Sequence, residues 1–104
     1  MFMTNKSYFK TVEELKEFLT DFGYEGTIVL ENPDYVGAVI GVDDEGRLVY
    51  SYDKMAQCLM NEDGMSYEEA AEFIDYNTIR ALPYMGTSAP IVFHELSELM
   101  GEID

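Results

Sequence analysis

Acidic residues outnumber basic residues by 21 to 6 in this chain of 104 residues, which gives a formal net charge of −15. The acids recur along segments that also carry regularly spaced apolar residues, and they are not confined to one tail. A folded domain with so much like charge stores electrostatic self-repulsion. The surface therefore either meets a basic partner or keeps the chain soluble and repels nucleic acid and anionic membranes.

Length and composition predict a single folded domain over residues 1–104. The chain is 47% hydrophobic and has eight Tyr and six Phe, whereas disordered acidic segments are poor in aromatic residues. Cys58 is the one cysteine in the sequence, so no intramolecular disulfide can form, as is typical of the reducing cytosol. The first ten residues lack the apolar core of a signal peptide, and no apolar run approaches the roughly 20 residues that cross a bilayer. We therefore expect a cytoplasmic protein with no membrane partner.

Hydrophobic periodicity predicts an α+β fold in the order α-β-β-β-α-α. Thr11 and Glu14 have the spacing of a capping box, and apolar residues recur at helical spacing from there to Gly23. Three strands are expected next, at residues 27–30, 36–42 and 48–52, with a hairpin turn at residues 43–46. These strands predict a small antiparallel three-stranded sheet with the helices packed on one face.

The sequence predicts that the second half of the chain is mainly helical. Ser51 or Asp53 can cap a helix that runs to about residue 62, and Ser66 with Glu69 forms a second capping box. The helix after Ser66 is expected to bury Ala70, Ala71, Ile74 and Thr78 and to end before Pro83. Residues 91–93 fit either a closing fourth strand or the start of a last helix that reaches residue 100.

The last two predicted helices superficially fit a helix-turn-helix, because a Gly-containing turn joins them. A DNA-reading helix needs Lys and Arg to neutralise phosphates. The second helix instead carries Glu68, Glu69, Glu72 and Asp75, with Arg80 at its end. We therefore predict an αα-hairpin packed on the sheet and no direct contact with nucleic acid.

Metal and catalytic motifs are weak throughout the sequence. Zinc sites use several Cys or His ligands at short spacings, whereas this chain has one of each, Cys58 and His94, far apart. Cys58 falls inside a predicted helix, where a packing role is favoured over a nucleophilic one. No nucleophile motif surrounds His94. We therefore expect no metal, no cofactor and no enzymatic activity.

Residues 76–86 are unusual for a surface segment, because aromatic residues, Asn77 and Arg80 gather at a helix end before a proline. In the structural interpretation, Arg80 complements the helix dipole and Tyr84 packs beneath the loop. In the functional interpretation, Tyr84 and Met85 contact a partner, since Tyr, Met and Arg are enriched at interfaces. The sequence favours the structural interpretation.

Several strings of the chain carry a resemblance to other sequences: residues 49–55 (VYSYDKM), 64–70 (GMSYEEA), 75–80 (DYNTIR), 83–84 (PY) and 89–91 (API). Over roughly residues 36–93 the chain resembles a group of short acidic proteins from bacteria and their phages or mobile elements. The group has no established activity, so the resemblance implies no functional residue. The size and acidity are also similar to those of anti-CRISPR and other DNA-mimic inhibitors, a similarity of composition alone.

We therefore expect a non-enzymatic acidic binding protein, most simply an inhibitor that occupies the basic nucleic-acid-binding groove of a host protein such as a CRISPR nuclease. Helix-borne carboxylates would stand in for phosphates and speed the encounter with a basic cleft. The residues expected to do so are Glu13, Glu17 and Asp21 on the first helix and Glu68, Glu69, Glu72 and Asp75 on the later one. The alternative is a small interaction or regulatory module whose charge mainly confers solubility and which binds through Tyr84 and Met85.

Overall fold

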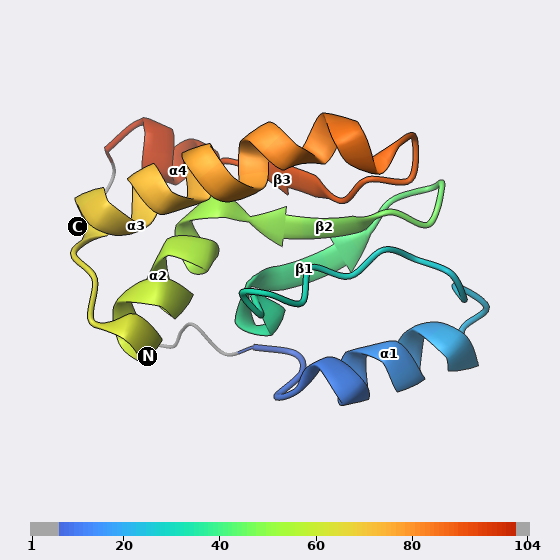
Figure 1. The fold of residues 1–104 in the computed structure, drawn as a ribbon. Coiled ribbons are helices and arrows are strands. Elements are labelled where there is room, and N and C mark those ends of the chain that lie inside the picture. The colour runs from blue at the N-terminus through green and yellow to red at the C-terminus, as the bar shows by residue number, and fades with distance from the viewer. Residues whose placement is uncertain (1–6, 102–104) are drawn as a thin grey trace.

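The computed structural model describes residues 7–101 and has an α+β fold built on three short strands (Figure 1). Residues 1–6 and 102–104, at the two ends of the predicted domain, lie outside the described residues. The elements in chain order are α1 (Val12–Asp21), η1 (Val36–Ala38), β1 (Val39–Val42), β2 (Leu48–Ser51), α2 (Tyr52–Asp63), α3 (Tyr67–Phe73), η2 (Ile74–Thr78), η3 (Ile79–Met85), β3 (Ile91–Phe93) and α4 (Leu96–Leu99). The predicted α+β class is confirmed.

The sheet is mixed, so the predicted all-antiparallel sheet is wrong. β2 lies in the middle, pairs antiparallel with β1 through the hairpin, and pairs parallel with β3. A parallel pair requires a long crossover connection. The chain supplies one, because the helical stretch from α2 to η3 carries it from the end of β2 back to the start of β3 (Figure 1). The sequence predicted either a closing strand or a last helix for the C-terminal segment, and each prediction is confirmed in part. Residues 91–93 form a strand, and residues 96–99 form a short helix.

The expected first strand at residues 27–30 does not form. Residues 27–30 pair with no strand of the sheet, and their polar groups form hydrogen bonds to other parts of the chain instead. The Leu30 N–H donates to the hydroxyl of Tyr50 over 3.0 Å, and the Thr27 hydroxyl donates to the Gly46 carbonyl oxygen over 3.1 Å. The expected strand 36–42 is likewise shorter, because its first three residues form the η1 turn.

Local capping signals place the helices well. Thr11 Oγ1 accepts a hydrogen bond from the Glu14 N–H. The Glu14 carboxylate accepts from the N–H of Lys10 and not from that of Thr11, so the capping box is incomplete. Ser51 caps α2, and Ser66 with Glu69 forms a complete capping box at α3. The predicted stop before Pro83 is wrong, since η3 includes that proline and ends at Met85. A proline has no N–H to donate, and the helical path has already left the regular α-helical hydrogen-bonding pattern from Ile74 onward, through the π-helix η2 and the 3-10 helix η3.

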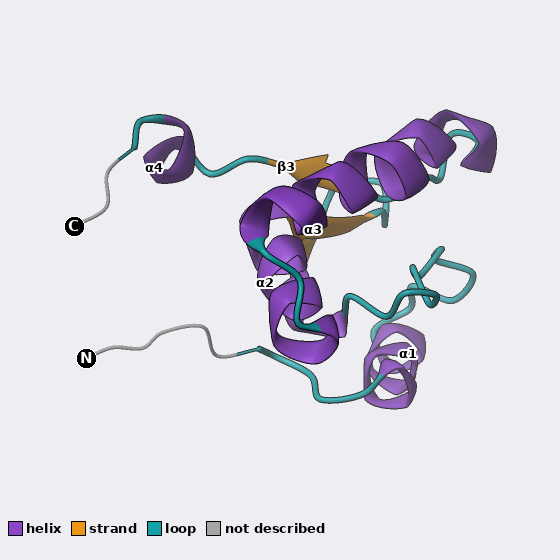
Figure 2. Cartoon of the chain, turned by 60° about the vertical axis from the view of Figure 1, so that its left-hand side comes forward, coloured by secondary structure: helices purple, strands orange, loops and turns teal. Residues whose placement is uncertain are grey.

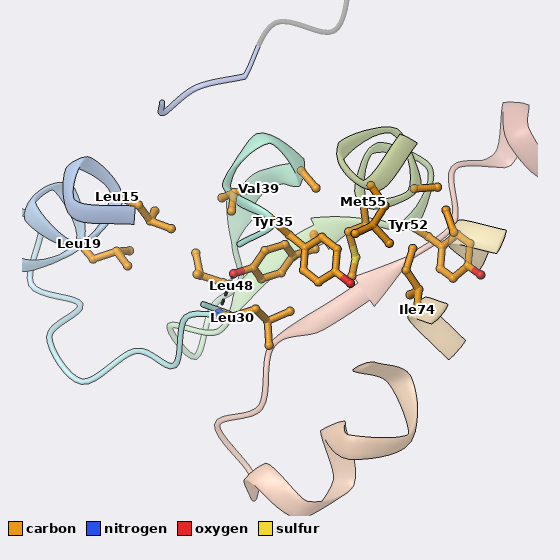
Figure 3. Close-up of a cluster of buried hydrophobic side chains, with 14 residues drawn as sticks. Leu15, Leu19, Leu30, Tyr35, Val39, Leu48, Tyr52, Met55 and Ile74 are labelled. Atoms are coloured by element: carbon orange, nitrogen blue, oxygen red, sulfur yellow. Dashed lines mark hydrogen bonds between the residues drawn. The ribbon is translucent and has the colours of Figure 1, made fainter. Parts of the chain in front are cut away.

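One hydrophobic core joins the sheet to α1, α2, α3 and η2 (Figure 3). Leu48 and Tyr50 alternate along β2 and therefore share one face of the sheet. Their cluster includes Leu15 and Leu19 of α1, Met55, Ala56 and Leu59 of α2, Ala70 of α3 and Ile74 of η2. The inner face predicted for the helix after Ser66 is confirmed, with Ala70, Ile74 and Thr78 buried and Ala71 half-buried.

Candidate protein-binding surface

The first set of predicted contact residues, Glu13, Glu17 and Asp21, forms an exposed row along α1, which we call the α1 row. All three line one shallow surface together with Lys16 and Thr20. Lys16 does not neutralise the row, because its Nζ lies 2.7 Å from Glu31 Oε2. Among the described residues, none forms an ion pair or a hydrogen bond with the carboxylates of the α1 row.

The second set, Glu68, Glu69, Glu72 and Asp75, forms the α3 row along α3 and η2, and all four residues are exposed. Two of them also hold the fold together. The Glu69 carboxylate accepts from the Ser66 N–H over 3.0 Å, and the Asp75 carboxylate accepts from the Tyr52 hydroxyl over 3.0 Å. Within residues 7–101, Glu68 and Glu72 have no such partner. These two carboxylates are therefore the ones most available to a binding partner.

The two rows do not merge into one acidic surface. α1 and α3 lie at opposite sides of the molecule in two views that differ by 60° about the vertical axis (Figures 1 and 2). A single partner groove would therefore contact one row at a time.

The rows differ in charge density. At about 1.5 Å of rise per residue, three carboxylates over residues 13–21 stand about 6 Å apart along the axis, and four over residues 68–75 stand about 3.5 Å apart. A DNA strand places one phosphate every 3.4 Å along the duplex axis. The α3 row therefore comes closer to the linear charge of a nucleic-acid strand than the α1 row does.

Tyr84 and Met85, the residues of the alternative contact site, are separated by the fold. The Tyr84 side chain is 90% exposed, so the expectation that it packs beneath the loop is wrong. Met85 is half-buried and packs against the hydrophobic core. Both residues lie at the end of η3, where Tyr84 is exposed while Met85 packs inward. Only Tyr84 is therefore presented to a partner.

The structure adds apolar contacts beside the α3 row that the sequence analysis did not single out. Met65, Phe73 and Tyr76 line an open groove of about 550 Å³ together with Glu69 and Glu72. The guanidinium of Arg80 lies 4.7 Å from the centre of the Tyr76 ring. The four-residue spacing of Tyr76 and Arg80 on a helix is a signal from which this contact could have been predicted. Arg80 is thus held against an aromatic face at the end of the acidic row.

Cys58 and His94 stand in different parts of the structure. The Cys58 thiol is half-buried against the core, and burial, reinforced by the negative charge of Glu62, raises its pKa to about 11. A thiol that ionises so late is a poor nucleophile at neutral pH. The His94 ring stacks on Tyr52 with 4.3 Å between the ring centres, and its Nδ1 lies 3.3 Å from Glu98 Oε2.

The Glu98 carboxylate is the centre of a small network that holds the C-terminal segment. Its Oε2 also accepts from the Tyr67 hydroxyl, while its Oε1 is buried without a hydrogen-bond partner within residues 7–101. Ser51 donates to the neighbouring Glu95 carboxylate over 3.2 Å. Within the described part of the chain, no three His, Cys, Asp or Glu side chains gather in a way that could hold a metal ion.

Comparison with known proteins adds no relative: no protein-family model, no curated protein and no solved structure matches this chain. The resemblance seen over residues 36–93 therefore stays a prediction. Among the described helices, none is long and apolar enough to cross a membrane.

Proposed function

We propose that this protein is a non-enzymatic acidic inhibitor that occupies the basic nucleic-acid-binding groove of a host protein, with the α3 row as its contact surface. The supporting observation is the set of exposed carboxylates on α3 and η2, spaced along the helix about as densely as phosphates along a DNA strand. Its place of action is the cytoplasm of a bacterial cell, where nucleic-acid-handling proteins such as CRISPR nucleases are found.

The mechanism is electrostatic competition. A row of carboxylates attracts a basic cleft over a long range, speeds the encounter, and then excludes the nucleic acid that the cleft would otherwise bind. All four carboxylates contribute to this attraction, because a hydrogen bond from a neutral donor leaves the charge of Glu69 and Asp75 in place. Glu68 and Glu72 are the two whose charge can be reversed without the loss of a hydrogen bond within the fold. Arg80, held over the ring of Tyr76, places a positive charge at one end of the α3 row. This charge makes the two ends of the row different, so a partner binds in one orientation along it.

Two matched charge-reversal variants test the proposal. Glu68→Lys with Glu72→Lys, and Glu13→Lys with Glu17→Lys, each exchange two exposed carboxylates on one helix and change the net charge equally. Proteins captured from a bacterial lysate by the wild type are purified, and displacement of labelled DNA from them is measured by fluorescence anisotropy. We expect the wild type and the α1 variant to displace DNA and the α3 variant to do so at least about tenfold more weakly.

Salt and folding measurements complete the test. Binding should weaken steeply between 0.01 M and 0.15 M salt, because the Debye length falls from about 30 Å to about 8 Å. Both variants should keep the thermal midpoint of the wild type within a few degrees, since exposed charges contribute little to stability. Salt-independent binding that survives reversal of the α3 row would refute the proposal.

The alternative function is a small interaction or regulatory module that binds through Tyr84. It is supported by the 90% exposure of that side chain, which exceeds that of the other exposed aromatic residues in the described part of the chain. In the same displacement experiment this alternative predicts salt-tolerant binding that is lost with Tyr84→Ala and kept by both charge-reversal variants.

A further inference from the structure

A groove of about 450 Å³ lies between α1 and β1, on a different side of the molecule from the α3 row. Its walls are apolar and aromatic, with Tyr8, Phe9 and Phe18 on one side and Ile40 and Val42 on the other. Its volume is in the range of pockets that bind ligands. Figure 1 shows α1 and β1, which border the groove, running in the same general direction.

The aromatic wall of the groove continues onto the outer surface of α1. The rings of Phe9 and Phe18 meet edge to face at 5.2 Å, and those of Phe18 and Phe22 stack at 4.4 Å. Phe18 is 39%, Phe22 65% and Tyr8 72% exposed. A contiguous exposed aromatic surface of this kind marks an interaction site more often than a solvated face.

The opposite wall is the free edge of a strand. All four residues of β1, from Val39 to Val42, line the groove together with Leu48 of β2, and a register shift between Val39 and Gly41 breaks the regular alternation of side chains along β1. β1 pairs only with β2 within the described sheet. A Cβ built on Gly41 would meet no atom within 4 Å, so the strand is open at that point. An unpaired edge of this kind accepts an added strand.

The border of the groove is acidic. Glu14 and Asp21 stand four residues before and three residues after Phe18, so they share its side of α1. The exposed residues Asp44 and Glu45 follow β1 closely in the hairpin. Lys16 and Arg47 are engaged by Glu31 and Asp43, which leaves Lys10, next to Phe9, as the cation at this border among the residues described.

We propose that this groove binds an extended basic segment of a partner protein, whose alternate apolar side chains enter the groove while its Lys or Arg side chains meet the carboxylates at the border. Charge selects this occupant. A second copy would bring another −15 to the same acidic border, and an anionic membrane would be repelled. The inference is independent of the proposed function, which rests on the α3 row.

Three labelled peptides of eight residues, capped at both ends, test the groove with the full chain. One alternates leucine with lysine, the second serine with lysine, and the third leucine with glutamate. Fluorescence anisotropy should show binding of the first, at least about tenfold weaker binding of the second, and no binding of the third. In the wild-type protein, the amide NMR shifts moved by the first peptide should map to residues 39–42 and to Phe9 and Phe18.

A matched pair of variants places the site. Phe18→Lys and Phe93→Lys exchange the same residue type, at the same 39% exposure, for the same positive charge, but only Phe18 lines the groove. Phe18→Lys should weaken the binding of the leucine–lysine peptide at least about tenfold. Phe93→Lys should leave the affinity within about twofold of the wild-type value.

Several results would overturn the inference. Equal binding of the two lysine peptides would mean that the acidic surface attracts cations without using the groove, an outcome that leaves the proposed function standing. NMR shifts confined to residues 68–75 would place the site on the α3 row. Self-association in sedimentation runs that Phe18→Lys abolishes would assign the groove to a second copy of the chain.

Discussion

Single hydroxyl groups connect segments of this fold that are far apart in the sequence. Tyr50 is fully buried, and its hydroxyl accepts the Leu30 N–H over 3.0 Å, marked by a dashed line in Figure 3. Tyr35 and Tyr52 are also buried and place their hydroxyls against Thr78 and Asp75. Each ring therefore contributes apolar area to the core while its polar end holds a distant segment.

Tyr50→Phe should lower the free energy of unfolding by about 1–3 kcal/mol, because the buried Leu30 N–H loses its partner while the ring is kept. Urea denaturation followed by circular dichroism measures the change. Tyr84→Phe is the control, since that side chain is 90% exposed and its loss of a hydroxyl should cost less than about 0.5 kcal/mol. Equal stabilities of the two variants would mean that the Tyr50 hydroxyl does not hold residues 27–30 in place.

These contacts also mark a limit of sequence analysis. Tyr50 and Leu30 are 20 residues apart, and Tyr35 and Thr78 are 43 apart, with no motif that connects them. A short β-branched segment such as residues 27–30 has the pattern of a strand, but the pattern does not say whether the segment pairs with the sheet. In this fold the hydroxyl of Tyr50 accepts the hydrogen bond that a neighbouring strand would otherwise accept from the Leu30 N–H.

At the scale of elements, signals that act within four residues predicted the helices. Thr11, Ser51 and Ser66 each cap the helix that follows, as their positions before apolar periodic segments indicated. The pairing of β3 was not predictable in the same way, because it depends on the path of the whole helical stretch between β2 and β3. The acidic rows were predicted as exposed helical faces, but their placement on opposite sides of the molecule followed only from the fold.

The capping box of α3 provides the prediction at this scale. Ser66→Ala should cost about 0.5–2 kcal/mol, because the N–H of Glu69 loses its acceptor at the start of the helix that carries the α3 row. Glu69→Gln should cost much less, since a glutamine side chain can still accept from the Ser66 N–H while it removes one charge. Thermal denaturation of both variants, with Ser88→Ala in an exposed loop as the control, measures the difference. A large loss with Glu69→Gln would show that its charge, and not its cap, stabilises the helix.

At the scale of the whole molecule, the acidic surface surrounds buried groups that must stay neutral. Burial raises the pKa of the Tyr50 hydroxyl to about 12, with the negative charges of Asp34 and Glu31 acting in the same direction. Burial likewise raises the pKa of Cys58 to about 11, and raises the pKa values of Tyr35 and Tyr52 above the ordinary value of 10.0. The negative surface charge thus adds to burial in raising the pKa values of the buried groups.

This coupling predicts a loss of stability at alkaline pH. In the unfolded chain Cys58 ionises near its ordinary pKa of 9.0 and the tyrosines near 10.0, whereas the folded chain keeps these protons. Above these values the unfolded state binds fewer protons than the native state, so the free energy of unfolding falls as the pH rises. The decline should begin near pH 9, and the contribution of Tyr50 to it should run from about pH 10 to about pH 12. Thermal midpoints at half-unit steps from pH 7 to about pH 11.5 measure it.

Two comparisons separate the buried groups from general repulsion between surface charges. Tyr50→Phe removes one of the titrating groups, so its stability, lower at neutral pH, should fall less steeply above pH 10 than that of the wild type. Salt at about 0.5 M should leave most of the decline in place, because burial is the leading cause of the raised pKa values and is not screened. A midpoint that is flat to pH 11, or a decline that salt abolishes, would show that the core groups do not hold their protons as the fold requires.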